Sequence, residues 1–493
     1  MLFTSLEFVA FVAIVAGAYP LCPVAWRRWY LLAVSYAFYC TWSVPFAGLM
    51  LIATAVAFVF AKRIGAATSE GARQQSLAVG VVALLLPLAA FKYLGSISGF
   101  LSDTVGGAPW LSRITAASFV GAIGISYYTL KLISYVVDVY WERTAPCGDF
   151  SSLATYVAFF PQILSGPIQR AESFLSQIAQ ITSVRPRMVT SGLQLMLFGF
   201  FKKLVVADRL GVPVDQVFDH PHAFSGLAPV IASYLFALQL YTDFSGITDI
   251  AIGTARLFGI ESPRNFDSPF YADSIQDFWR RWHMTLTSWL GEYVFTPLRM
   301  MLRGWGQAGL IISLAINMLA IGVWHGPRWT YVVFGMIHAG YLIGSTLTQR
   351  RRKKLLQRQP VLSRLHTVVG PLVTFNMVVA SFVFFRATTL SDALYILAQA
   401  GGGLLNAVVK IAHGTLHGVM GKGHLAWNAA DVLIACAGLL AMEVVHLLHH
   451  RGALSQVTAA TPGWVRWSAY FALGFAILIW GEGDSKQFIY VRF

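Results

Sequence analysis

The sequence predicts an all-α polytopic membrane protein. Of its 493 residues, 56% are hydrophobic and only 12% are charged, whereas soluble domains carry about 25% charged residues. Mean hydropathy is +0.62, and apolar stretches of about 20 residues, long enough to cross a bilayer, recur throughout. Because backbone inside a membrane must satisfy its own hydrogen bonds, aperiodic apolar runs of this length are typical of helices and not of barrel strands.

The membrane helices are expected in apolar stretches spread over the chain. The first stretch lacks a basic region before it and a clear cleavage site, so we interpret it as a retained helix and not as a signal peptide. The second is either one long helix or two short ones. The stretches are residues 8–24, 30–60, 76–94, 117–140, 188–207, 227–255, 310–326, 330–348, 367–386, 426–448 and 466–481.

The charge pattern fits this class. The net charge is +14, which in a soluble protein would suggest nucleic acid as a partner. Here the basic residues are expected at helix ends, as in Arg27–Arg28, Lys62–Arg63, Lys202–Lys203 and Arg350–Lys354. The positive-inside rule explains such residues as cytoplasmic loops, with contact to anionic lipids as a secondary effect. The four cysteines have no paired spacing, so we expect neither a metal site nor a disulfide framework.

The domain organisation is expected to be simple. No fixed-period repeat and no low-complexity linker is visible. The longest polar stretch, residues 348–364, is too short to divide independent domains. We expect one membrane domain over residues 1–493, with its functional centre at about 150–345.

An irregular apolar segment lies at residues 159–170. Pro161 and Pro167 cannot donate backbone hydrogen bonds, and Gly166 weakens a helix. Non-helical backbone at membrane depth is tolerated only where protein buries it or water fills a cavity. We therefore expect a broken or re-entrant segment that lines a cavity, with Gln162 among its lining residues. The alternative is a helix end kinked by proline.

Two carboxylates, Asp243 and Asp249, interrupt the next apolar run at positions i and i+6. That spacing places them on different faces of a helix, which argues against a paired acid and base. Each is expected to accept hydrogen bonds from a neighbouring helix or from a cavity group, and Ser245 lies beside them. A purely structural role is the alternative.

A helix is predicted from Ser274 to Leu290, after the polar turn that contains Asn265. Ser274 is a plausible N-cap, and Asp277 and Arg281 form an i,i+4 pair in the favourable order. On one continuous helix Trp279 and His283 would share a face, and the indole would pack against the imidazole.

The basic residues of this helix have two interpretations. Arg280 and Arg281, flanked by aromatic residues, would suit a phosphorylated donor such as coenzyme A. The alternative is that a helix rich in tryptophan and arginine anchors the protein in the membrane interface. An anchor would not require His283.

The segment Gly322–Pro327 closes the apolar run 310–323 and places Trp324 and His325 at the hydrocarbon boundary. Ionisable residues inside a membrane are candidate functional sites because they are costly to bury. An imidazole in an apolar cavity stays neutral and is a competent general base toward a hydroxyl or thiol. His338 is a third candidate, for which structural hydrogen bonding is the alternative.

No motif for a covalent nucleophile, a phosphate loop or a zinc protease is present. This favours direct transfer, in which one histidine activates an acceptor hydroxyl and the site holds an activated acyl group beside it.

The chain resembles the membrane-bound O-acyltransferase family, and within it the bacterial alginate O-acetyltransferase (AlgI-like) branch, which also includes teichoic-acid D-alanylation proteins. The likeness covers nearly the whole chain and is densest from 155 to 345. The blocks that carry it are Phe160–Gln162 with Ser165–Pro167, Asp243–Gly246 with Asp249–Gly253, Asn265–Phe266, Phe278–His283, Trp289–Leu290 with Tyr293, Gly322–Gly326 and the carboxyl end Phe488–Phe493. At Gly291 the chain departs from this branch, which commonly carries a charged residue there.

The resemblance implies a ring of about 11 or more transmembrane or re-entrant helices around a central funnel or tunnel. It implies that His325 is the catalytic histidine and that His283 matches the second motif histidine. It implies an acyl thioester donor on the cytoplasmic side, with acetyl-coenzyme A as the usual assignment and no bound cofactor. In this branch the acyl group crosses the bacterial inner membrane to a periplasmic or extracellular acyltransferase of the SGNH type, which modifies a polysaccharide.

Several alternatives remain at this point. The final acceptor is expected to be alginate-like, cellulose or another exopolysaccharide, and peptidoglycan O-acetylation or D-alanyl transfer to a cell-wall polymer is the alternative. A transporter or channel is the alternative from a different class, because broken helices and buried polar residues occur there too.

Overall fold

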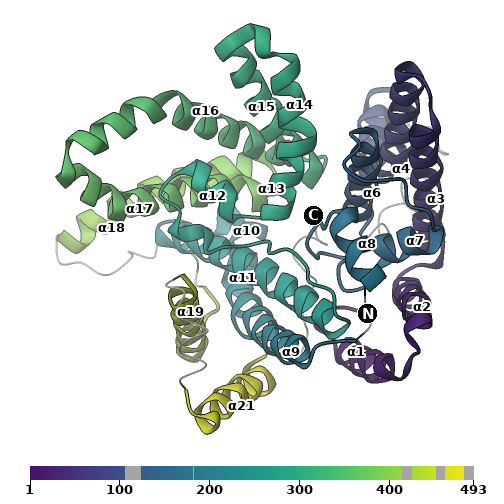
Figure 1. Cartoon of the computed structure of the whole chain (residues 1–493). Coiled ribbons are helices and arrows are strands. Elements are labelled where there is room, and N and C mark those ends of the chain that lie inside the picture. Colours follow the sequence, from purple (N-terminus) through teal and green to yellow (C-terminus); the bar gives the residue numbers. More distant parts are fainter. Residues whose placement is uncertain (106–123, 181–182, 413–422, 424, 451–460, 482–493) are drawn as a thin grey trace. The chain divides into compact units, whose positions relative to one another are not determined.

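The computed structural model describes residues 1–105, 124–180, 183–412, 423, 425–450 and 461–481 (Figure 1). Every regular element in these ranges is a helix. Within them, nine helices are long and apolar enough to cross a membrane. The prediction of an all-α, multi-pass membrane protein is confirmed. The carboxyl-terminal block 488–493 lies outside the described residues.

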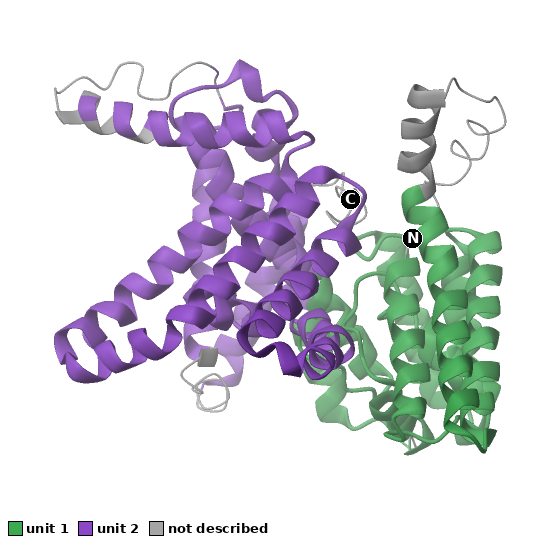
Figure 2. Cartoon of the chain, turned by 90° about the horizontal axis from the view of Figure 1, so that it is seen from above, with its two compact units in different colours: residues 1–196, 247–264 green, residues 197–246, 265–493 purple. Residues whose placement is uncertain are grey.

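The chain divides into two compact units (Figure 2). Unit 1 comprises residues 1–196 and 247–264, and unit 2 comprises residues 197–246 and 265–493. Two of the boundaries fall inside long helices, α9 (Pro186–Phe200) and α11 (Leu227–Leu257). The expectation of a single membrane domain stays a prediction.

Unit 1 contains the amino-terminal helices. Side chains of Ser5, Ser43 and Asp149 accept hydrogen bonds from backbone N–H groups of the first turns and cap α1, α3 and α7. The stretch 30–60 forms two helices, and residues 117–123 of the predicted fourth span lie outside the described residues. The helices are α1 (Leu6–Ala18), α2 (Arg27–Cys40), α3 (Val44–Ala66), α4 (Glu70–Val105), α6 (Ile125–Tyr140), α7 (Phe150–Ala158) and α8 (Ala171–Gln180).

The segment after α7 is not helical, as its two prolines predict. Helix α7 ends at Ala158, no helix follows until Ala171, and residues 159–169 are all buried. The expectation of a broken segment is confirmed, and a kinked helix end is excluded. That the segment lines a cavity stays a prediction.

Unit 2 contains the later helices and two π-helical turns, η3 and η6. A π-helical turn widens the hydrogen-bond ladder and is frequent at functional sites. The elements are η3 (Phe201–Ala207), α10 (Asp208–Asp219), α12 (Ile275–Arg281), α13 (Met284–Leu290), η6 (Gly291–Phe295), α14 (Thr296–Met301), α15 (Gly306–His325), α16 (Trp329–Arg358), α17 (Pro360–Arg386), α18 (Leu390–Ala412), α19 (Ala429–His450) and α21 (Gly463–Trp480).

Helices α15 and α16 form a closely packed antiparallel pair. A Cβ atom added at Gly335 would lie 2.8 Å from the Met318 carbonyl oxygen, and one added at Gly322 would overlap the Tyr331 carbonyl oxygen. Glycine at both positions lets the two backbones touch, which fixes the register of the pair.

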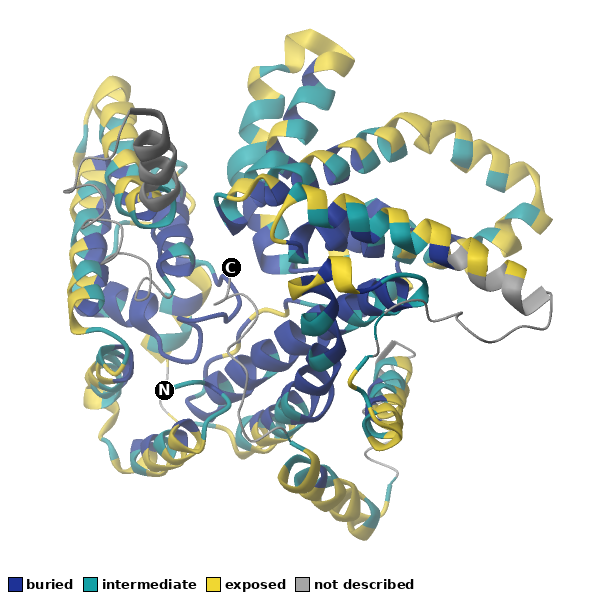
Figure 3. Cartoon of the chain, turned by 180° about the vertical axis from the view of Figure 1, so that it is seen from behind, coloured by how far each residue is buried: buried dark blue, intermediate teal, exposed yellow. Residues whose placement is uncertain are grey.

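Large apolar side chains are exposed on the outer faces of several helices, as in Leu86, Val361 and Leu478 at 62%, 78% and 79% exposure. The carboxyl-terminal half of α16 is also largely exposed (Figure 3), but it is polar and carries the basic run 350–354. Exposed leucine and valine are compatible with water only as scattered residues, so apolar faces of this extent indicate contact with lipid.

Candidate functional site

His325 ends helix α15 inside an aromatic enclosure. Gly326 and Pro327 follow it, and proline cannot extend the helix. The imidazole is 7% exposed. Its ring centroid lies 4.8 Å from that of Trp324 and 4.7 Å from that of Phe385. The histidine is therefore held at a helix end in an apolar environment, as the sequence predicts.

The second histidine lies at a helix break that the sequence analysis did not predict. Helix α12 ends at Arg281, and His283 adopts a left-handed conformation with φ of 42° before α13 begins. The backbone here pairs with an earlier turn: the Asp267 N–H donates to the Arg281 carbonyl at 3.0 Å, and the Met284 N–H donates to the Asn265 carbonyl at 2.8 Å. The prediction of one helix from Ser274 to Leu290 is wrong because these bonds replace helical ones.

His283 is oriented by a hydrogen bond on one side only. Its Nδ1 lies 3.3 Å from Asn265 Oδ1, which also accepts a hydrogen bond from the Thr285 hydroxyl at 2.5 Å. Because that oxygen is an acceptor, a neutral imidazole donates from Nδ1 and carries its lone pair on Nε2. His283 Nε2 is buried and has no hydrogen-bond partner.

The charge state of His283 follows from its burial. The side chain is 1% exposed, and burial lowers the pKa of His283 to about 3. Desolvation penalises the charged form, so the imidazole is neutral at physiological pH. It can act as a base or as a hydrogen-bond acceptor.

Trp324 lies between the two histidines. Its ring centroid is 6.0 Å from that of His283 and 4.8 Å from that of His325. The structure thus brings together two segments that are 42 residues apart in the sequence, and one indole contacts both imidazoles.

Trp279 does not pack on His283, and that prediction is wrong. Because the helix breaks after Arg281, the i,i+4 relation is lost. The Trp279 indole N–H instead bonds to His338 Nδ1 at 3.2 Å, and His338 Nε2 lies 2.9 Å from the Ser381 hydroxyl. Both ring nitrogens of His338 are engaged within the protein, which favours the structural alternative for this residue.

The two arginines of α12 have different environments. Arg281 Nε donates to Asp277 Oδ2 at 2.7 Å, and its Nη1 donates to the Asp267 carbonyl. The predicted N-cap, Ser274, and the predicted Asp277–Arg281 pair are confirmed. The Arg280 side chain is 73% exposed and reaches Asp277 only at 3.5 Å. Arg280 is therefore the guanidinium of this pair that is available to an anion.

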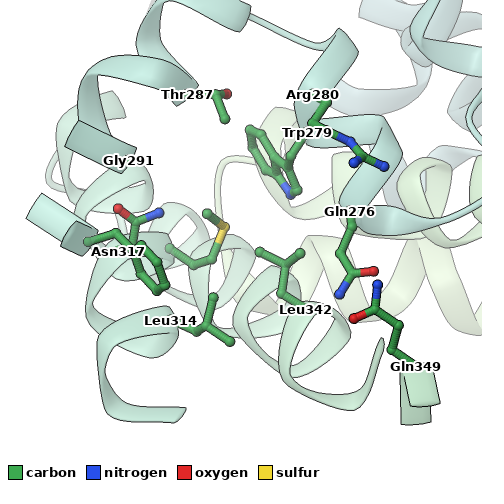
Figure 4. A pocket seen from close by; sticks show the side chains of 11 residues that line it. Gln276, Trp279, Arg280, Thr287, Gly291, Leu314, Asn317, Leu342 and Gln349 are labelled. Carbon is green, nitrogen blue, oxygen red and sulfur yellow. The ribbon is translucent and has the colours of Figure 1, made fainter. Parts of the chain in front are cut away.

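A pocket of about 370 Å³ lies beside Arg280 (Figure 4). Polar side chains line parts of it, and apolar side chains line the rest. Figure 4 shows Asn317 on the opposite side of the pocket from Gln276 and Gln349. The lining residues are Gln276, Trp279, Arg280, Thr287, Gly291, Phe295, Leu314, Asn317, Met318, Leu342 and Gln349.

Asn317 is the site residue that the sequence analysis missed. It is 7% exposed, and its Oδ1 atom has no hydrogen-bond partner. A buried polar atom without a partner is costly, so a ligand that donates a hydrogen bond would be favoured here. The sequence does contain a signal for this residue, because Asn317 is the one side-chain amide in the apolar run 310–323.

Lys202 and Lys203 are not at a helix end, and that expectation is wrong. They lie in the π-helical turn η3 and are 3% and 2% exposed. Lys203 Nζ lies 2.7 Å from an oxygen of Asp243, and Lys202 Nζ donates to the Ser245 hydroxyl at 3.3 Å. For Asp243 the predicted contact with a neighbouring helix is confirmed.

Gln162 belongs to a polar cluster in unit 1. Its Nε2 donates to Gln169 Oε1 and to the Ser262 hydroxyl, each at 2.7 Å. Its Oε1 accepts from Lys131 Nζ at 3.3 Å, and Lys131 also donates to the Tyr156 carbonyl. Gln162 is buried, and these bonds satisfy both ends of its amide.

Comparisons of the sequence with known proteins show which family it resembles. The model of the membrane-bound O-acyltransferase family matches residues 148–385. The chain is 32% identical to the probable alginate O-acetylase AlgI of Azotobacter vinelandii, over 80% of this chain and 76% of the relative. It is 32% identical to the peptidoglycan O-acetyltransferase of Helicobacter pylori, over 79% of this chain and 76% of the relative. The teichoic acid D-alanyltransferase of Bacillus subtilis is 27% identical to the chain, over 62% of this chain and 76% of the relative.

Proposed function

The chain belongs to the membrane-bound O-acyltransferase family, and on that premise we propose that it is an O-acetyltransferase of polysaccharide modification. It takes an acetyl group from acetyl-coenzyme A at the cytoplasmic face and passes it across the membrane for O-acetylation of an extracellular or periplasmic polysaccharide. The observation that carries this proposal is the pair of buried histidines on either side of Trp324. Family membership also decides against a transporter or channel.

His325 serves as the general base. It takes the proton from the acceptor hydroxyl while the hydroxyl oxygen attacks the carbonyl carbon of the acetyl thioester. The new C–O bond forms, the C–S bond breaks, and the proton passes from His325 to the leaving thiolate. General-base catalysis by a positioned histidine contributes about 10²–10⁴-fold. His283 supports the step because its Nε2, which has no partner within the protein, would accept a hydrogen bond from an N–H or O–H group of either substrate.

The pocket beside α12 suits the donor. A phosphate would bind Arg280 at the exposed edge, with Gln276 and Gln349 nearby. An amide N–H of the thioester's extended arm would donate to Asn317 Oδ1, and the apolar lining would hold the methylene groups. Asn317 lies eight residues before His325 in α15, which is about 12 Å along a helix.

The destination of the acetyl group lies outside this chain. A partner of the SGNH acetyltransferase class in the periplasm would receive it and modify the polymer, and the chain itself would lie in the bacterial inner membrane with its helices around a central funnel or tunnel. An alginate-like acceptor is favoured because five relatives at 32% identity are named probable alginate O-acetylase AlgI. Peptidoglycan is the second candidate because a relative of equal identity carries that activity in its name.

The test is reconstitution in liposomes with acetyl-coenzyme A on one face and acceptor and partner on the other. His325→Ala should insert normally and lose transfer by about 10²–10⁴-fold. His338→Gln is the matched control, since this equally buried histidine is hydrogen-bonded elsewhere, and it should retain turnover. Near wild-type transfer by His325→Ala at equal protein level would refute the assignment. Polymer acetylation without any partner would refute the relay.

A further inference from the structure

A buried ion cluster, consisting of Lys203, Asp208 and Asp243, lies inside unit 2. Lys203 Nζ is 2.7 Å from Asp208 Oδ1 and 2.7 Å from Asp243 Oδ1, and all three side chains are 2–3% exposed. A buried ion pair is seldom more stabilising than apolar packing of the same volume. A buried ion pair can instead fix the relative position of the elements that carry it, because each buried charge tolerates only a few arrangements of its partners.

The cluster locks helix α11 against the π-helical turn η3. Lys203 extends from η3 to Asp243, and its neighbour Lys202 reaches Ser245. Between these contacts the backbones almost touch, since a Cβ atom added at Gly246 would lie 2.9 Å from the Gly199 carbonyl oxygen. These contacts fix both the rotation and the height of α11 at residues 243–246.

Phe244 connects the position of α11 to that of His283. It follows Asp243 in the chain, and its ring meets the His283 imidazole edge-on, with centroids 4.7 Å apart at 88°. On its other side Phe244 packs against Phe266 at 5.0 Å. Asn265 and Trp324 also restrain the imidazole, so Phe244 is one of at least three residues that hold the ring in place.

We propose that the buried ion cluster positions His283: by fixing α11 it holds Phe244 against the imidazole and keeps Nδ1 on Asn265 and Nε2 unpaired. The inference rests on the proposed function only in that His283 takes part in the reaction. Lys203, Asp208, Asp243 and Phe244 are positioning residues and touch no substrate in this scheme.

The test compares a neutral cluster with a matched control. Lys203→Met, Asp208→Asn and Asp243→Asn together remove all three charges at similar side-chain size. Arg209→Met with Asp431→Asn removes another ion pair of unit 2, at 3.1 Å, which joins α10 to α19. For each protein, thermal unfolding in detergent, kcat and KM for acetyl transfer, and the rate of His283 carbethoxylation by diethylpyrocarbonate are measured.

The neutral cluster should lower kcat by roughly 10- to 100-fold, the cost of a small misplacement of a reacting group, with KM unchanged. His283 should be modified several-fold faster, and the control should change neither quantity. Wild-type kcat and modification rate in the neutral cluster, or an equal loss in the control, would overturn the proposal.

If the triple variant with the neutral cluster does not fold, Phe244→Leu provides a second test of the proposal. This variant leaves the three charges intact and removes the ring that contacts His283. It should show the same fall in kcat and the same rise in His283 modification. Wild-type values of both in Phe244→Leu would overturn the proposal. If the wild-type chain transfers no acetyl group, the proposed function fails, and the modification rates still test the positioning.

Discussion

At the scale of single residues, Asn317 and His283 share an unusual property. Each presents a buried polar atom without a protein partner, Oδ1 in one and Nε2 in the other. Most buried polar atoms in native proteins are paired, as His338 and Gln162 are here. Asn317 Oδ1 lines the pocket beside Arg280, and His283 Nε2 belongs to an imidazole that contacts Trp324, so these two acceptors mark positions where substrate groups would complete the hydrogen bonding.

Asn317→Leu tests the pocket. The leucine removes an acceptor that no protein group uses, so thermal stability should be unchanged or higher. The Michaelis constant for acetyl-coenzyme A should rise about 2- to 12-fold, the value of one hydrogen bond of about 0.5–1.5 kcal/mol. Ser313→Ala, one turn away and bonded to the Gly309 carbonyl, is the control. An unchanged Michaelis constant in Asn317→Leu would show that the donor does not use this pocket.

At the scale of the elements, the break between α12 and α13 and the contact between α15 and α16 place the histidines. The break turns His283 away from Trp279 and toward Phe244 and Trp324. The glycine contact at Gly322 brings α16 against the last turn of α15, directly before His325. The positions of His283 and His325 therefore depend on contacts with other helices as well as on their own segments.

Gly322→Ala should therefore destabilise the protein by about 1–3 kcal/mol, as overpacking of a close contact does, because the new methyl group meets the Tyr331 carbonyl oxygen. Activity should fall as His325 shifts. Gly340→Ala in α16 is the matched control: its Cβ meets nothing within 4 Å, and alanine raises helix propensity by about 1 kcal/mol. A melting temperature for Gly322→Ala equal to that of the control would contradict this packing.

The sequence predicted the elements better than their contacts. Hydropathy located the spans, proline and glycine located the broken segment after α7, and side-chain chemistry located the Ser274 cap. The break at His283 escaped prediction because backbone hydrogen bonds from Asn265 and Asp267 cause it, and these partners are distant in sequence. The burial of Lys203 escaped for the same reason, since its partner Asp243 lies on another helix.

At the scale of the whole molecule, the basic run Arg350–Lys354 is expected to orient the chain in the membrane. It lies near the carboxyl end of α16, where the helix is largely exposed. Consecutive basic residues beside a span are retained on the cytoplasmic side. The same rule does not apply to Lys202 and Lys203, which are buried and paired.

A cysteine at the exposed Gln357, in a background without the four native cysteines, should react with a permeant maleimide in intact cells. An impermeant maleimide should leave it unmodified. A cysteine at Arg328, exposed at the opposite end of α16, should react with both. Labelling of Gln357→Cys by the impermeant reagent would reverse this topology.

The buried cluster also has a consequence for how the protein is made. During synthesis Lys203 leaves the ribosome about 40 residues before Asp243, which at roughly 5–20 residues per second is a delay of about two to eight seconds. In that interval Asp208, five residues away, is the available carboxylate of the cluster, and Lys203 must enter the bilayer with one of its two ion-pair partners or wait at the membrane surface. The α9–η3–α10 segment is therefore expected to integrate together with α11, as a hairpin. In a nascent chain that stops before Asp243, the earlier spans should be anchored, and the α9–η3–α10 segment alone should stay accessible to a water-soluble cysteine reagent.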